Sequence, residues 1–322
     1  MIQLSGVTKH YGDHKAVDAL SVLIRESETF VLLGTSGCGK TTTLRMINRL
    51  ITADEGSIEI NGAPIDSTPP EQLRRTIGYV MQQNGLFPHY TVVENIAVVP
   101  TLLGWPKDQI RKRALSLMEQ LHLPANSFAH RYPHQLSGGQ QQRVGVARAL
   151  AGNAPILLMD EPFGALDPVT RSLIRKEFME LEEISKKTIV LVTHDIPEAF
   201  EMADRICLMN KGRAEQTGTP SELLFSPASA FVRSFFDADR ELLELNIVTM
   251  RDLWPHLGEP VSSSDLPDSI RQFPAATSCW QILNWLTGEQ AAASVSYQHD
   301  IKMVSRANLL QALGDYKTSQ YG

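Results

Sequence analysis

One glycine-rich stretch of the sequence has the residue types and spacing of a phosphate-binding loop. Gly34 to Thr41, GTSGCGKT, matches G-x-x-x-x-G-K-[ST]. Its glycines let backbone N–H groups approach phosphate oxygens, and the N-terminus of a following helix, expected over Thr42 to Leu50, adds a favourable dipole. Lys40 supplies a point charge for the β- and γ-phosphates, and the Thr41 hydroxyl is a ligand for Mg²⁺. The stretch predicts a nucleoside triphosphate site.

A second stretch supplies two carboxylates at the end of an apolar run. In ILLMDEP, Ile156 to Pro162, Asp160 is placed to hold the water shell of Mg²⁺, and Glu161 is placed to face an attacking water molecule. Because a glutamate with a pKa of about 4.3 is a weak base for water, we expect Glu161 to act mainly by orienting and polarising the water.

A third stretch, LSGGQQQR at Leu136 to Arg143, allows two interpretations. Ser137 and Gln140 fit S-x-x-Q, a capping box for a helix over Gln141 to Leu150. The pair Gly138-Gly139 also leaves backbone N–H groups exposed beside the cap, where a helix N-terminus binds anions. The residues alone leave both roles open.

The elements that must position these residues follow an α/β pattern. The apolar runs lack alternation, as expected for parallel strands that are covered on both faces. The pattern turns helical between Gly85 and Gly152, including Asp108 to Leu121, which predicts a helical subdomain inserted into the sheet core. The predicted strands are Phe30 to Leu33, Ile77 to Val80, Ile156 to Met159, Thr188 to Val192 and Arg205 to Met209.

Composition excludes several classes of protein. The 322 residues include 36 acidic and 30 basic side chains, and the net charge of -6 argues against a nucleic-acid partner. Cys38, Cys207 and Cys279 have no disulfide or zinc spacing. No apolar run approaches the roughly 18 residues of a membrane helix, so we expect a cytosolic chain that meets a membrane only through a partner.

Residues 1 to 235 resemble the ATP-binding cassette (ABC) ATPases, because each motif of that family occurs in order. LSGGQ at Leu136 to Gln140 matches the signature motif, and Gln82 in YVMQQNGLFPH matches the Q-loop residue. GALD at Gly164 to Asp167 matches the D-loop, His194 in LVTHD matches the switch histidine, and Tyr11 matches the aromatic that stacks on adenine.

The resemblance implies an α/β P-loop NTPase fold of the ABC cassette type, with a RecA-like core, an N-terminal antiparallel β part and the helical subdomain at about residues 85–152. It implies ATP and Mg²⁺ as cofactors. It implies catalytic roles for Glu161, His194, Gln82 and Lys40, and metal-binding roles for Thr41, Gln82 and Asp160. The residues it implies for ATP binding are Tyr11, Gly34, Thr35, Ser36, Gly37, Cys38, Gly39, Lys40, Thr41, Thr42, Ser137, Gly138, Gly139, Gln140 and Asp167.

The resemblance also resolves the role of the third stretch. In ABC ATPases two cassettes pack head to tail, and the signature loop of one faces the γ-phosphate held by the other. Since this chain has one cassette, the resemblance implies a homodimer with two composite sites.

Four stretches further resemble the ATPases of osmoprotectant importers. That resemblance implies uptake of glycine betaine, choline, carnitine or a related amine through an integral membrane permease, with an extracytoplasmic substrate-binding protein. The chain would lie on the cytoplasmic face of the inner membrane. An importer ATPase for an amino acid or a polyamine is the alternative. A soluble non-transport ABC ATPase is disfavoured, because such proteins generally carry a long coiled-coil insertion or two cassettes in tandem and this sequence has neither. The stretches are Leu44 to Leu50, Gly78 to His89, Asn95 to Pro100 and Arg131 to Ala151.

Residues 236–322 form a smaller α+β unit after the cassette. A helix from Cys279, strands over Ala291 to Tyr297 and Ile301 to Val304, and a helix capped by Ser305 are similar to one cystathionine-β-synthase (CBS) motif. Asn308 stands where adenosine-binding CBS motifs have an aspartate. A regulatory sensor and a dimerisation or packing module are both compatible with this pattern.

Overall fold

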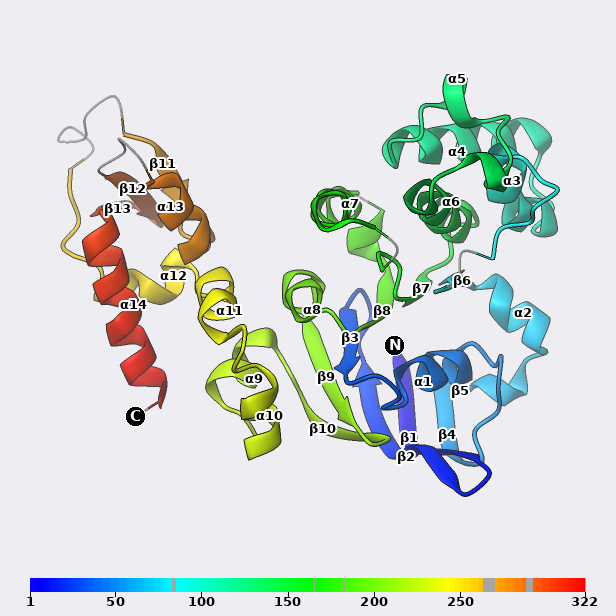
Figure 1. The fold of residues 1–322 in the computed structure, drawn as a ribbon, viewed down its shortest axis with the longest axis horizontal. Coiled ribbons are helices and arrows are strands. Elements are labelled where there is room, and N and C mark those ends of the chain that lie inside the picture. Colours follow the sequence, from blue (N-terminus) through cyan, green and yellow to red (C-terminus); the bar gives the residue numbers. More distant parts are fainter. Residues whose placement is uncertain (83–84, 165, 182, 263–269, 288–291, 322) are drawn as a thin grey trace. The chain divides into compact units, whose positions relative to one another are not determined.

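The computed structural model describes residues 1–82, 85–164, 166–181, 183–262, 270–287 and 292–321. It forms two compact units, Met1–Thr217 and Gly218–Gly322, which we describe separately (Figure 1). The boundary expected after residue 235 falls inside the second unit, at the end of α10 (Ala230–Phe235). No helix in the described ranges is long and apolar enough to span a membrane.

A six-stranded sheet forms the centre of the first unit, in the order β10-β9-β3-β8-β7-β6. All five predicted strands are present, and those joined by a described register pair in parallel. β3, β7 and β8 are buried along their whole length, as their unbroken apolar runs predicted. The sequence did not reveal β10, because RAEQTG is polar and partly exposed. The strands are β3 (Thr29–Gly34), β6 (Ile77–Val80), β7 (Ile156–Asp160), β8 (Thr188–Thr193), β9 (Arg205–Asn210) and β10 (Arg213–Gly218).

A second sheet, in the order β2-β1-β4-β5, confirms the antiparallel N-terminal part. Apolar residues of β1, β2 and β4 share one core with the central sheet and with α1 (Lys40–Ile47), the helix after the phosphate loop. This core holds the loop between two layers of strands. The strands are β1 (Ile2–Tyr11), β2 (His14–Ile24), β4 (Glu55–Ile60) and β5 (Ala63–Pro64).

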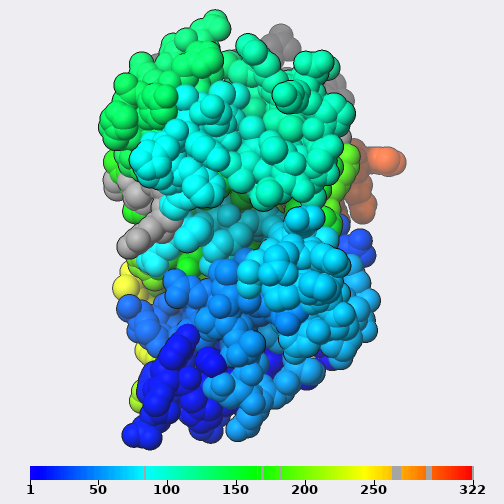
Figure 2. All heavy atoms as spheres, turned by 90° about the vertical axis from the view of Figure 1, so that its right-hand side faces the viewer, coloured from blue at the N-terminus to red at the C-terminus, as the bar shows by residue number. Residues whose placement is uncertain are grey.

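The helical subdomain consists of α3, α4, α5 and α6, and α4 lies within one residue of the predicted range. Helix α6 begins at Gly138, earlier than the predicted Gln141, because the capping box of Ser137 and Gln140 starts the helix directly after the cap. Figure 2 shows this subdomain, cyan to green, at one end of a face whose other end is blue. The helices of the first unit are α2 (Pro70–Arg75), α3 (Val92–Leu102), α4 (Lys107–Gln120), α5 (Ala125–Phe128), α6 (Gly138–Ala151), α7 (Pro168–Glu180) and α8 (Ile196–Met202).

The second unit contains the predicted helix, two strands and helix in order. A further strand, β11 (Gln272–Pro274), pairs in parallel with β12 (Ala293–Tyr297), which pairs antiparallel with β13 (Asp300–Val304). Ser305 accepts from the Asn308 N–H at 3.3 Å, and Asn308 Oδ1 accepts from the Ser305 N–H at 2.6 Å, so Asn308 completes a reciprocal cap. Ala291, the first residue of the predicted strand, lies outside the described residues. The helices are α9 (Pro220–Phe225), α10, α11 (Arg240–Ile247), α12 (Met250–Leu253), α13 (Cys279–Trp285) and α14 (Arg306–Tyr321).

Candidate functional site

The loop between β3 and α1 has glycine where neighbouring backbone leaves no room for a side chain. A Cβ atom on Gly34 would lie 2.1 Å from the Met209 carbonyl oxygen, and one on Gly39 would lie 2.3 Å from the Ala16 carbonyl oxygen. The strands β9 and β2 thus clamp the two ends of the loop. Thr35, Ser36 and Gly37 at its tip are exposed, as a ligand-binding tip requires, whereas Cys38, Gly39 and Lys40 are buried. Thr41 and Thr42 follow in the first turn of α1.

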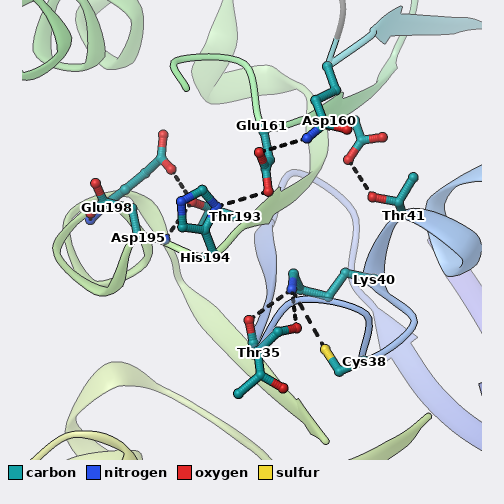
Figure 3. Close-up of polar contacts among 12 residues, drawn as sticks. Thr35, Cys38, Lys40, Thr41, Asp160, Glu161, Thr193, His194, Asp195 and Glu198 are labelled. Atoms are coloured by element: carbon teal, nitrogen blue, oxygen red, sulfur yellow. Dashed lines mark hydrogen bonds and ion pairs between the residues drawn. The ribbon is translucent and has the colours of Figure 1, made fainter. Parts of the chain in front are cut away.

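Lys40 lies against its own loop in this structure. Its Nζ atom donates to the carbonyl oxygens of Gly34 at 2.8 Å and Thr35 at 2.9 Å (Figure 3). The Cys38 Sγ atom is 3.7 Å from the same Nζ atom. The ammonium group is therefore held inside the concave side of the loop, where phosphate oxygens would meet it.

Two of the predicted metal ligands are already joined. The Thr41 hydroxyl donates to Asp160 Oδ1 at 2.9 Å, which links the first turn of α1 to the end of β7 (Figure 3). Asp160 is 1% exposed, and this burial raises the pKa of its carboxyl above the ordinary value. Gln82 lines the same pocket as Asp160. The Thr41 hydroxyl, the buried Asp160 carboxylate and the Gln82 amide oxygen form a donor set that fits Mg²⁺.

Glu161 is the centre of a second cluster. Its carboxylate accepts from Gln82 Nε2 at 2.9 Å through Oε2. Its Oε1 lies 2.9 Å from His194 Nδ1 (Figure 3). The three residues follow β6, β7 and β8, which are adjacent strands of the sheet. The structure therefore brings together three residues that the sequence placed far apart.

The loop that carries His194 is anchored by buried polar groups. The Thr193 hydroxyl donates to the Glu198 carboxylate and accepts from the Asp195 N–H at 3.0 Å. Asp195 caps α8 and pairs with Arg171 at 2.9 Å. Glu198 is 4% exposed, and burial raises the pKa of its carboxyl from 4.5 to about 7. Nothing in the sequence pattern singled out Glu198.

Tyr11 lies at the end of β1, opposite His14 across the β1–β2 turn. The residue is 52% exposed, and Lys9 Nζ lies 5.9 Å from the ring centre. An exposed aromatic ring in this position is free to stack on a flat ligand. Strand β2, which pairs with β1, also contributes the Ala16 carbonyl that Gly39 touches, so one sheet supports both the ring and the phosphate loop.

The signature residues form a separate group at the start of α6. The Ser137 N–H donates to Gln140 Oε1 at 2.9 Å, and the Gln140 N–H donates to Ser137 Oγ at 3.3 Å. The two residues therefore form a reciprocal pair of hydrogen bonds. The N–H groups of Gly138 and Gly139, in the first turn, have no intrahelical partner. Asp167 caps α7 by accepting from the Thr170 N–H at 3.0 Å. Ala165 of the predicted D-loop lies outside the described residues, as do Gln83 and Asn84 of the predicted Q-loop stretch.

Comparison with known proteins identifies the family. The ABC transporter family profile matches residues 17–164. The chain is 50% identical over 258 residues to the osmoprotectant import ATP-binding protein OsmV of Salmonella typhimurium, a match that covers 79% of this chain and 68% of that protein. The chain belongs to the ABC transporter ATP-binding proteins. It is therefore an ATPase of the transporter-coupled type.

Two further comparisons agree with this assignment. The glycine betaine uptake system ATP-binding protein YehX of Escherichia coli is 50% identical over 253 residues, which cover 79% of this chain and 81% of that protein. The dimeric post-hydrolysis structure of the ATP-binding cassette MJ0796, bound to ADP and Pi, has a TM-score of 0.62 and 37% identity. That match covers 68% of this chain and 98% of the other. The predicted ABC cassette fold is confirmed.

Proposed function

We propose that this ABC ATPase hydrolyses ATP at two composite sites of a homodimer and powers uptake of an osmoprotectant such as glycine betaine, choline or carnitine. The observation that carries the proposal is the Glu161 carboxylate, which is bonded by both Gln82 and His194. Asp160, which accepts from the Thr41 hydroxyl, directly precedes Glu161 at the end of β7. This arrangement suits phosphoryl transfer to water.

The phosphate loop binds and orients the nucleotide. Thr35, Ser36 and Gly37 present backbone N–H groups, Lys40 turns its ammonium to the β- and γ-phosphates, and Tyr11 stacks on adenine. Thr41, Asp160 and Gln82 would hold Mg²⁺, which neutralises phosphate charge when bound.

Glu161 and His194 act at the γ-phosphate end of the site. Glu161 orients and polarises the attacking water, and its bond from Gln82 fixes the direction of the carboxylate. His194 lies on the other carboxylate oxygen, at an exposed loop end, where its ring would face the γ-phosphate of bound ATP.

The signature group serves the ATP of the partner chain. Its exposed Ser137 and the N–H groups of Gly138 and Gly139, which have no intrahelical partner, form an anion-binding surface that the phosphate loop of the same chain does not use. The homodimer then has two composite sites, each with Lys40 from one chain and Ser137 from the other. Contact of the signature group with the γ-phosphate of the partner's ATP closes the dimer. Hydrolysis removes that contact, and the dimer opens.

The osmoprotectant substrate is supported by the names of the relatives that match at 50% identity. The chain would dock on an integral membrane permease at the cytoplasmic face of the inner membrane, served by an extracytoplasmic substrate-binding protein. An importer for an amino acid or a polyamine is the second candidate substrate class. The second unit, CBS-like in its order of elements, would act as a regulatory or dimerisation unit.

The experiment is uptake by cells that lack this gene and receive it back as the wild type or as Glu161→Gln. We expect labelled glycine betaine, choline or carnitine to accumulate with the wild type only, because the amide cannot polarise the water. In the purified protein the same substitution lowers ATP hydrolysis about 100-fold while ATP binding remains. Uptake of spermidine or an amino acid instead would replace the proposed substrate, and unchanged hydrolysis in Glu161→Gln would contradict the role of Glu161.

A further inference from the structure

Gln142 links the signature helix to the backbone of Glu161. It lies on α6, whose N-cap is Ser137, and its side chain is buried, with 2% of the residue exposed. Its Nε2 atom donates to the Glu161 carbonyl oxygen at 3.3 Å. Within the described residues its Oε1 atom is buried without a hydrogen-bond partner. A buried amide oxygen without a hydrogen-bond partner lowers the stability of the fold. Stability alone therefore does not explain why a glutamine occupies this position.

The backbone of Glu161 is unusual and is held on both sides. Its φ of 46° lies in the left-handed region, which is strained for a non-glycine residue. Its N–H donates to the Val192 carbonyl at 2.9 Å, and its carbonyl also accepts from the Gly164 N–H at 3.2 Å. Both of these bonds come from the sheet core and the loop after β7, whereas the bond from Gln142 comes from the helical subdomain. The direction of the Glu161 side chain follows from this fixed backbone.

Helix α6 touches the site elements at three points along its length. At its start, a Cβ atom on Gly139 would lie 2.5 Å from Leu166 Cδ2, so the signature turn packs directly on the loop that leads to Asp167. In its first half Gln142 reaches Glu161, and farther along Arg148 Nη1 donates at 2.8 Å to the carbonyl of Gly85, in the loop after Gln82. A shift of α6 therefore reaches the backbone of Glu161.

We infer that Gln142 is a positioning residue, which transmits the position of the signature helix to the Glu161 carboxylate of the same chain. The inference rests on the proposed function, in which the N-terminus of α6 meets the partner's ATP. Engagement of that ATP at one composite site then sets the catalytic glutamate of the other through the Gln142 bond. Gln142 touches neither ATP nor water; it acts through Glu161.

The test replaces Gln142 by methionine, which has a similar length and no donor. We expect kcat for ATP hydrolysis to fall about tenfold, with KM for ATP unchanged, because one buried hydrogen bond to the Glu161 peptide is lost. The melting temperature should stay equal or rise, since the unpartnered Oε1 is removed as well. Gln120→Met, at an exposed position at the end of α4, is the matched control and should change neither quantity. If Gln142→Met does not fold, Gln142→Leu replaces it in the same measurements of kcat and melting temperature.

A double-mutant cycle with Glu161→Gln separates positioning from packing. If Gln142 acts through Glu161, the double variant hydrolyses ATP in a single turnover as slowly as Glu161→Gln alone. The inference is overturned if the two losses multiply, if kcat is unchanged in Gln142→Met, or if its loss follows a lowered melting temperature. Absence of ATP hydrolysis in the wild type would instead overturn the proposed function.

Discussion

At the scale of single residues, the site depends on where three polar side chains meet. The sequence predicted Gln82, Glu161 and His194 individually, by their motifs. That Gln82 and His194 both lie on the Glu161 carboxylate follows from the strand order β8-β7-β6, which places the ends of three sequence-distant strands side by side. Local patterns do not encode that order, because it is decided by long-range pairing.

The residues that the sequence did not reveal are those whose role depends on burial. Gln142 follows the signature motif as one of three consecutive glutamines, and nothing in its type distinguishes it from its neighbours. Glu198 lies in an ordinary helix start, yet the fold buries its carboxyl beside Thr193. Burial of a polar side chain becomes visible only when the packed neighbours are known.

Glu198 predicts a pH dependence of stability. Because burial raises the pKa of its carboxyl from 4.5 to about 7, the folded chain holds more protons than the unfolded chain between these values. The free energy of unfolding therefore falls as pH rises from 4.5 to about 7, by up to about 3 kcal/mol. Glu198→Gln, which keeps an acceptor for the Thr193 hydroxyl, should flatten that part of the curve.

Urea denaturation at several pH values between 4 and 8 measures this effect. The matched control is Glu180→Gln, whose side chain is 67% exposed and should leave the curve unchanged. A Glu198→Gln variant that keeps the full wild-type slope would show that this carboxyl does not titrate in the window.

At the scale of elements, the phosphate loop depends on close backbone approach. Gly39 has a φ of 105° as the N-cap of α1, and its Cα faces the Ala16 carbonyl of β2. The motif predicted glycine there for access to phosphate. The structure adds a second reason, because no side chain fits between α1 and β2.

Gly39→Ala should lower the free energy of unfolding by about 2 kcal/mol or more and abolish ATP binding, since its Cβ would meet the Ala16 carbonyl at 2.3 Å. Gly314→Ala is the control, because Gly314 is exposed within α14 and its Cβ would have no neighbour within 4 Å. That variant should stabilise the chain by about 0.5–1 kcal/mol. Thermal unfolding and nucleotide binding are measured for both variants. Retained ATP binding in Gly39→Ala would contradict the steric explanation.

Sequence periodicity predicted the strongly patterned elements of the fold. Buried runs such as Ile156–Asp160 and the apolar stripe of α4 were found within a residue or two. The polar strand β10 was missed, because it pairs at the sheet edge without an apolar run. The helix predicted after Ser305 continues to Tyr321 through polar residues that carry no periodic signal.

At the scale of the whole molecule, the proposed homodimer makes each ATP site the joint product of two chains. In that homodimer one chain would contribute the phosphate loop with Lys40 and Glu161, and the other would contribute Ser137 at the start of α6. Within one chain, Lys40 donates to the carbonyl groups of its own loop, whereas Ser137 and Gln140 bond each other. The sequence alone supplied both halves, but the division between chains came from the family resemblance.

The central claim is tested most directly by ATP retention in mixed dimers of the slow Glu161→Gln chain. Lys40→Ala and Ser137→Arg are introduced separately into that chain, and retained ATP is measured after gel filtration. Neither variant alone should retain ATP, while a mixture should retain about a quarter of the amount per chain that Glu161→Gln retains, because half of its dimers carry one intact composite site. Full retention by the Ser137→Arg chain alone, or none by the mixture, would contradict sites shared between two chains.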